Sequence, residues 1–183
     1  KMRQRGVRVQ VESAEKLKKE MMSQEKEILQ AIKKESGTEV DIWAPRHIAK
    51  AFDKMKLDYP RTEKTKEPSF TQNWLINNKN KIAQLIVSAR EINKFHSTFL
   101  SSILRYQVKG RIHGEIQQLR SDLGGTVSGR LSMSNPNLQQ VPARNKDLGP
   151  KIRSLFIPEE GYQWGSFDYS QQEPRMTVHY AAS

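Results

Sequence analysis

Helical periodicity that runs through the first hundred residues and then stops constrains the fold most. Residues 12–34 and 80–103 both carry apolar side chains every three or four positions, which predicts two long amphipathic helices. We expect Ser13 to cap the start of the first helix and Gly37 to end it. The buried stripe of the second helix comprises Ile82, Leu85, Ile86, Ala89, Ile92, Phe99 and Ile103. Its polar face is expected to carry Lys81, Arg90, Lys94 and His96.

Shorter elements surround these helices. A helix is predicted from Pro45 through Met55, because proline is tolerated in the first turn. Residues 58–69 contain two prolines and no aliphatic side chain, which is typical of a loop. Short strands are expected at Val7–Val9, Arg111–Ile116 and Tyr162–Phe167, and a last helix at Gln171–Ala182.

The switch from helical to strand-like spacing near residue 108 predicts two subdomains. Residues 1–108 would form a helical subdomain, and residues 109–183 part of an antiparallel sheet with a flanking helix. The fold class predicted from this order is α+β, because the helices precede the strands in a block.

Composition excludes several classes of protein. The chain has no cysteine, so neither a disulfide framework nor a thiolate metal site is possible. No apolar run approaches the roughly 18 residues that span a bilayer, and the first residues lack the apolar stretch of a signal peptide. We therefore expect a folded protein of the cytoplasm, without a membrane partner, and the lysine at position 1 suggests a piece of a longer chain.

The net charge of +11 is distributed unevenly. Residues 1–122 hold 25 lysines and arginines against 15 acidic residues, whereas residues 123–183 hold six against five. A basic helical part beside a nearly neutral part is typical of a DNA-gripping element next to a site that retains carboxylates for a metal ion. A basic surface that only solvates the chain explains the same numbers.

Asp168 is the main candidate for catalysis. It follows the predicted strand Tyr162–Phe167, a usual way to present a carboxylate to a divalent cation. The competing interpretations are a turn or cap role for Asp168 and a capping box formed by Ser170 and Glu173.

Two long motifs add a family resemblance. Residues 168–175, Asp-Tyr-Ser-Gln-Gln-Glu-Pro-Arg, are similar to motif A of family A DNA polymerases, the family of bacterial DNA polymerase I. Residues 128–145, from Ser-Gly-Arg-Leu-Ser to Pro-Ala-Arg-Asn, resemble a second family motif, and residues 153–157 resemble the stretch between the two. Weaker similarity covers residues 1–9 and 90–99, so nearly the whole chain resembles the thumb and the first part of the palm of these polymerases. The sequence of the second motif is more similar to phage members of the family than to bacterial repair enzymes.

The resemblance implies roles in catalysis and nucleotide binding. Asp168 and the backbone carbonyl of Tyr169 would bind the Mg²⁺ ions of a two-metal site. Glu173 would exclude the 2′-hydroxyl of ribonucleotides, and Gln171 and Arg144 would contact the incoming dNTP.

The resemblance also implies contacts with primer-template DNA. Arg130, Asn137 and Gln139 would reach the minor groove. The resemblance also implies that Arg130, like Asp168 and Glu173, is a catalytic residue. A polar turn held by its own side chains is the alternative for this cluster. Arg90 and Lys94 would grip duplex phosphates from the polar face of the long helix, with Lys64 and Lys66 as weaker candidates in the loop.

Three positions depart from the family pattern, and some family parts are absent. Pro174, Gln172 and Gln140 replace the usual residues. Because of Pro174, the helix after Asp168 is expected to start later than in relatives, and Gln172 and Gln140 change the surroundings of the sugar gate and of the minor-groove donors. The fingers helix and the second metal-binding carboxylate do not occur in these 183 residues. We therefore expect the chain to depend on the remaining fingers and palm of a parent polymerase, and not to extend primers alone.

Two other functions fit the same sequence less well. A non-catalytic module that binds double-stranded DNA would need the basic helices but not the carboxylates at 168 and 173. A relative of phage RNA polymerases is disfavoured by Glu173, which would reject ribonucleotides.

Overall fold

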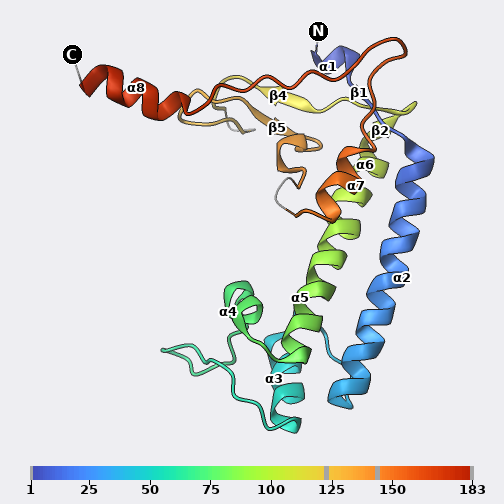
Figure 1. The fold of residues 1–183 in the computed structure, drawn as a ribbon, viewed down its shortest axis with the longest axis vertical. Coiled ribbons are helices and arrows are strands. Elements are labelled where there is room, and N and C mark those ends of the chain that lie inside the picture. Colours follow the sequence, from blue (N-terminus) through green and yellow to red (C-terminus); the bar gives the residue numbers. More distant parts are fainter. Residues whose placement is uncertain (1, 122–123, 143–144, 182–183) are drawn as a thin grey trace.

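Two long, antiparallel helical segments form an arm that carries a small β region at one end (Figure 1). The computed structural model describes residues 2–121, 124–142 and 145–181. Helix α2, Val11–Ser36, packs along a continuous segment made of α5, Lys81–Lys94, a π-helix, Phe95–Leu100, and α6, Ser101–Tyr106. We call residues 11–106 the helical arm. The mixture of this arm with small antiparallel sheets confirms the predicted α+β class.

The first predicted helix is confirmed, although its start differs from the prediction. Gly37 ends α2 in the left-handed conformation, with φ 64°, and its N–H donates to Lys33 O at 2.8 Å. Glycine adopts this conformation without a steric penalty, which explains the C-cap. The prediction that Ser13 is the N-cap is wrong: the N-cap is Gln10, three residues earlier, and its side chain makes no capping bond.

The second predicted helix has the expected length but contains an unpredicted π-helical segment, Phe95–Leu100. Ser101 Oγ donates to His96 O, five residues earlier, at 2.9 Å. The wider turn changes which side chains face inward, so Phe95, His96 and Leu100 are all buried. The buried His96 Nε2 lies 2.6 Å from Glu25 Oε2, so its predicted place on the polar face is wrong.

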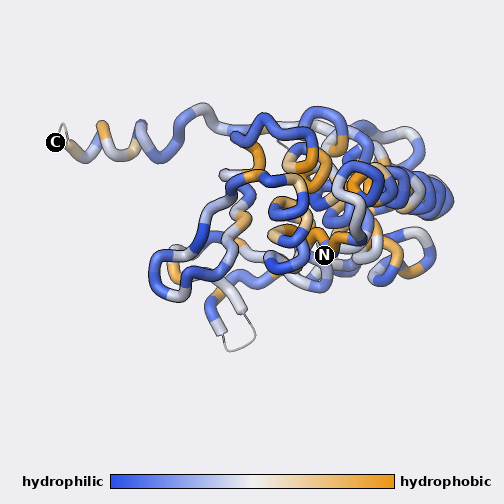
Figure 2. The backbone as a smooth tube through the Cα atoms, turned by 90° about the horizontal axis from the view of Figure 1, so that it is seen from below, coloured by the Kyte–Doolittle hydropathy of each residue, from blue (hydrophilic) through white to orange (hydrophobic). Residues whose placement is uncertain are grey.

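The seam between the two long segments contains two apolar cores. One lies at the end of the arm away from the strands and the other under the strands. Fully buried side chains of the first include Ile48, Phe52, Leu75, Ile82 and Ile86, and those of the second include Met21, Phe95, Leu100, Ile112 and Ile152. Each such side chain contributes about 1.5–3 kcal/mol of transfer free energy, so these two cores are the main source of stability. Figure 2 shows most of the hydrophobic stretches of the tube within this body, and a few more near the C-terminus.

The far end of the arm is closed by two short helices and a loop. Helix α3, Pro45–Lys54, begins at proline as predicted. Residues 58–69 form the predicted loop, with one bridge between Arg61 and Pro68. Helix α4, Gln72–Asn77, was not predicted; Thr71 caps it by accepting from Trp74 N at 3.3 Å.

The β region joins the beginning of the chain to its middle. Strand β1, Val7–Arg8, pairs antiparallel with β3, Arg111–Ile112, which also pairs with β2, Gln107–Val108. Strand β1 follows the short helix α1, Met2–Arg5, and its pairing with β3 crosses the predicted subdomain boundary at residue 108.

A separate antiparallel pair, which we call the hairpin, follows the three-stranded sheet. It consists of β4, Glu115–Gln117, and β5, Ser132–Ser134, with Ile116 opposite Met133. After β5 the chain forms the 3₁₀-helix η2, Leu138–Gln140, and helix α7, Leu148–Arg153, which packs on the arm.

The last part of the chain extends away from the body (Figure 1). The predicted helix is confirmed as α8, Gln172–Ala181. The predicted strand Tyr162–Phe167 is wrong, since these residues form no strand. A strand needs a neighbouring strand for its N–H and C=O groups, and this segment pairs with none. Tyr162 N donates to the nearby Glu159 O at 3.0 Å, and the indole of Trp164 donates to Phe156 O at 3.3 Å. Phe167 is 96% exposed as a result.

Arg90 lies inside the arm, so the prediction that it occupies the exposed polar face is wrong. Only 8% of the residue is exposed. Its Nε donates to Ile42 O at 2.8 Å and its Nη1 to Phe70 O at 3.2 Å, while its guanidinium lies 5.2 Å from the ring centre of Trp43. Burial lowers the pKa of Arg90. The guanidinium donates to two carbonyls at the point where the loops after α2 and before α4 meet α5. These hydrogen bonds stabilise the buried side chain more than hydration would stabilise it at the surface.

Arg90→Met should destabilise the arm by about 1–3 kcal/mol, because it leaves two buried carbonyls without donors. Lys94→Met, four residues along the same segment at an exposed position, is the matched control and should change stability by less than about 0.5 kcal/mol. Urea unfolding followed by circular dichroism measures both values. Equal unfolding free energies for the two variants would show that Arg90 does not support the fold.

Candidate functional site

The segment after the hairpin gathers three of the predicted DNA-contacting residues. Asn137 Oδ1 accepts from Gln139 N at 3.0 Å and so caps η2. Gln139 Nε2 donates to the carbonyl of Leu131, the neighbour of Arg130, at 3.1 Å. The carbonyl of Arg130 itself accepts from Thr126 Oγ1 at 2.6 Å. Arg130, Asn137 and Gln139 therefore lie close together, on a scaffold of side chain to backbone bonds.

Asp168 and Tyr169 lie on the exposed stretch that leads into α8. Tyr169 is 82% exposed, and Asp168 is exposed as well. Asp168 is thus neither in a sealed interior nor at the N-cap of α8. Its carboxylate and the carbonyl of Tyr169 are hard oxygen donors of the kind that Mg²⁺ prefers, although two donors are fewer than the six it usually takes.

Helix α8 starts later than a capping box with Ser170 would require. Gln171, with φ 51°, precedes the first helical residue, and Arg175 N donates to Gln171 O at 3.0 Å. Pro174 is the third residue of the helix, where an N–H has no helical acceptor, so its missing hydrogen costs nothing. This agrees with the later start expected from Pro174, and it removes the capping-box interpretation of Glu173.

Glu173 instead forms an ion pair with Arg130. The two side chains come from the two motifs, and they are 73% and 70% exposed. An ion pair this exposed contributes little to stability and is easily exchanged for other partners. The contact nevertheless places a carboxylate and a guanidinium beside the exposed segment that carries Asp168.

The remaining predicted site residues are more dispersed. Lys94 is exposed and borders a groove of about 260 Å³ that Gln140 and Asn145 also line, so it faces the second motif. Arg90 is enclosed by the arm and does not reach this groove. Arg144 lies outside the described residues. Within residues 2–121, 124–142 and 145–181, no group of three or more acidic or histidine side chains converges on a metal-sized site.

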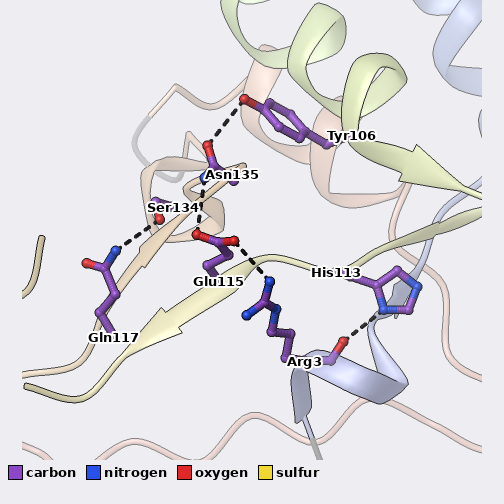
Figure 3. A network of polar contacts seen from close by, with 7 residues as sticks. All are labelled: Arg3, Tyr106, His113, Glu115, Gln117, Ser134 and Asn135. Carbon is purple, nitrogen blue, oxygen red and sulfur yellow. Dashed lines mark hydrogen bonds and ion pairs between the residues drawn. The ribbon is translucent and has the colours of Figure 1, made fainter. Parts of the chain in front are cut away.

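A polar network beneath the second motif was not predicted. It joins Arg3, Tyr106, Glu115 and Asn135, which come from α1, α6, β4 and the end of β5 (Figure 3). Arg3 and Glu115 are 112 positions apart. No local spacing could have indicated this contact, because it exists only once β1 and β3 are paired.

Comparison with known proteins identifies the family. The profile of DNA polymerase family A matches residues 11–183. A DNA-directed DNA polymerase of Pseudomonas phage M6 is 38% identical over 98% of this chain and 28% of its own length. The thermostable DNA polymerase I of Thermus filiformis is 34% identical over 97% of this chain and 21% of its own length.

A solved structure agrees with the sequence relatives. The polymerase domain of Pol1 from M. smegmatis, in complex with a DNA primer-template and dNTP, superimposes with a TM-score of 0.71 and 27% identity. The match covers 86% of this chain and 28% of that one. The chain thus spans less than a third of each of these relatives.

No helix in the described part of the chain is long and apolar enough to cross a membrane.

The matches cover both motifs and the helical arm, and they agree in sequence and in fold. The chain belongs to DNA polymerase family A.

Proposed function

We propose that this chain is the thumb and the first part of the palm of a DNA-directed DNA polymerase that adds dNTPs to a primer 3′ end. The helical arm would be the thumb, within residues 1–108, and residues 109–183 would carry the palm part. The observation that carries the proposal is the ion pair between Arg130 and Glu173, which joins the second motif to the motif that contains Asp168. The solved relative described above, bound to primer-template and dNTP, supports these substrates.

Asp168 would hold the metal site of this chain. Its carboxylate and the carbonyl of Tyr169 would bind Mg²⁺, which supplies charge neutralisation at the transferring phosphate and activation of the primer 3′-hydroxyl. The exposure of both residues leaves room for substrate phosphates and for further ligands from the parent protein. With one carboxylate here, the chain alone would not extend primers.

Glu173 would select the sugar of the incoming nucleotide. A carboxylate under the ribose ring collides with a 2′-hydroxyl, the atom that distinguishes NTP from dNTP. Glu173 lies in the first turn of α8, five residues after Asp168. Gln171, directly before that turn, and Arg144 would contact the same nucleotide.

Arg130, Asn137 and Gln139 would contact the minor groove of the primer-template. Purine N3 and pyrimidine O2 are acceptors in every base pair, so donors placed there test pair geometry without reading sequence. Gln139 donates one N–H to Leu131, which leaves its second N–H for an acceptor on DNA. The guanidinium of Arg130 would exchange Glu173 for the DNA when the duplex binds.

Lys94 would contact duplex phosphates from the side of the arm that faces the second motif. Such a contact is independent of sequence and sensitive to salt, because it releases condensed counterions. Arg90 is not part of this proposal, since its guanidinium is enclosed between Ile42 and Phe70. Lys64 and Lys66 are exposed in the loop and would add weaker contacts.

Lys94→Met should reduce the slope of log binding constant against log salt concentration by about 1, the contribution of one phosphate contact. Fluorescence anisotropy of a labelled duplex between low and moderate salt measures the slope. Lys19→Met, an equal charge change at an exposed position of α2, is the matched control for net charge. A slope equal to that of the control would remove Lys94 from the proposed interface.

Asp168→Ala should abolish primer extension in a polymerase that carries this chain together with the remaining family parts. Loss of several kcal/mol of transition-state stabilisation corresponds to a decrease of roughly a thousandfold or more. Duplex affinity should stay within about twofold, because Asp168 contacts metal rather than phosphates of the bound duplex. Asp147→Ala, an exposed aspartate before α7, is the control that should extend primers normally. Unimpaired extension by Asp168→Ala would refute the proposed polymerase site.

Glu173→Ala in the same polymerase should increase the incorporation of NTP relative to dNTP by tenfold or more, on the order of the 10–200-fold that one steric feature in a pocket supplies. Single-nucleotide insertion with matched dNTP and NTP measures the ratio. An unchanged ratio, with dNTP insertion intact, would assign sugar selection to another residue.

A further inference from the structure

Asn135, at the end of β5, is held from two sides by its own amide. Tyr106 Oη donates to Asn135 Oδ1 at 3.3 Å, and Asn135 Nδ2 donates to Glu115 Oε2 at 3.2 Å (Figure 3). The other oxygen of Glu115, Oε1, accepts from Arg3 Nη2 at 3.0 Å. Both carboxylate oxygens and both ends of the amide are therefore used, which fixes the orientation of the amide as well as its position.

The backbone conformation of Asn135 explains why the position of its side chain matters. Asn135 has φ 52°, in the left-handed region, and asparagine is one of the few residues that tolerate it. The next residue, Pro136, is buried, and the chain then turns into η2 with Asn137 as its cap. The side chain of Asn135 thus anchors a turn at a point two residues before Asn137 and four before Gln139.

The anchor reaches parts of the chain that the turn cannot contact by itself. Tyr106 is the last residue of α6 in the helical arm, Glu115 begins β4, and Arg3 lies in α1. The network therefore fixes the turn relative to the arm, from which Lys94 faces the neighbouring groove. The arm and the turn would approach the same duplex from different sides.

Stability alone does not account for the network. The side chains of Arg3 and Glu115 are 65% and 39% exposed, and exposed ion pairs contribute little to folding. Charge-assisted bonds in a fixed geometry are directional, however, so their main effect here is on orientation.

We propose that Glu115 and Tyr106 are positioning residues that orient, through Asn135, the donors Asn137 and Gln139 for the DNA minor groove. This inference rests on the proposed function. Neither positioning residue contacts DNA; they act by holding the amide of Asn135, and so the turn that follows it, in one orientation.

The test is binding of the chain to a duplex in which every purine is the 3-deaza analogue, compared with the natural duplex of the same sequence. The analogue replaces the minor-groove acceptor N3 by C–H and keeps the phosphates unchanged. We expect wild type to bind the analogue about fivefold more weakly, the value of one hydrogen bond. Gln139→Ala should lower this ratio, because it removes one of the proposed minor-groove donors while Arg130 and Asn137 remain.

Glu115→Gln should bring the ratio to less than half its wild-type value, because one carboxylate oxygen becomes an NH2 group that cannot accept, so Arg3 and Asn135 can no longer both be bonded. Tyr106→Phe, which removes a single hydroxyl, should lower the ratio in the same direction. Glu39→Gln is the matched control: it neutralises another carboxylate in an exposed ion pair, with Lys33, and should leave the ratio unchanged. The thermal midpoint of each variant separates orientation from unfolding, since partial unfolding weakens binding to both duplexes equally.

The possible outcomes distinguish failure of the positioning role from failure of the proposed minor-groove contact. If wild type discriminates and Gln139→Ala lowers the ratio, but Glu115→Gln and Tyr106→Phe both keep the full ratio, the positioning role is wrong and the minor-groove contact stands. If wild type binds both duplexes equally, the proposed minor-groove contact fails and the positioning role fails with it.

Discussion

The apolar seam between α2 and the α5–α6 segment is the constraint on which the other parts depend. Side chains such as Met21 and Ile32 from α2 meet Ile82, Ile86 and Leu100 along the opposite segment. Because the two segments are antiparallel and of similar length, their ends coincide, and this brings the chain before α2 next to the chain after α6. The three-stranded sheet forms at that point, and the hairpin with the second motif follows directly. The segment after α7 then adds backbone bonds to the first strand, such as Ile157 N to Arg8 O at 3.1 Å.

The π-helical segment places polar side chains inside the arm, where each of them finds a hydrogen-bond partner. The wider turn at Phe95–Leu100 buries Phe95 and His96 together, and His96 is then matched by Glu25. Asn93 donates to the other oxygen of Glu25 at 2.8 Å, so the carboxylate is bound on both sides. Buried polar groups are tolerated when all are bonded, and this cluster meets that condition.

Local sequence patterns predicted the elements whose structure depends mainly on neighbouring residues, which here are the helices. The helices beginning near Glu12, Pro45 and Asn80 followed from apolar spacing and from proline and glycine at their ends, because an amphipathic helix carries its own signature. The strand at Tyr162–Phe167 could not be judged in the same way, since a strand exists only with a neighbour. Arg90 was misplaced because its position on a helix does not reveal that two carbonyls distant in sequence need its donors. The motif residues were identified by resemblance, whereas Tyr106 and Glu115 had no sequence signal at all.

The pairing of β1 with β3 has a kinetic consequence. Val7 lies opposite Ile112, so this contact closes a loop of about a hundred residues that contains the whole helical arm. Closing a loop of that length costs more chain entropy than forming a helix turn, and contacts distant in sequence slow folding. The arm should therefore assemble early, from contacts within and between its helices. The sheet, with the turn that presents Asn137 and Gln139, would then be the last part to become ordered and the first to open.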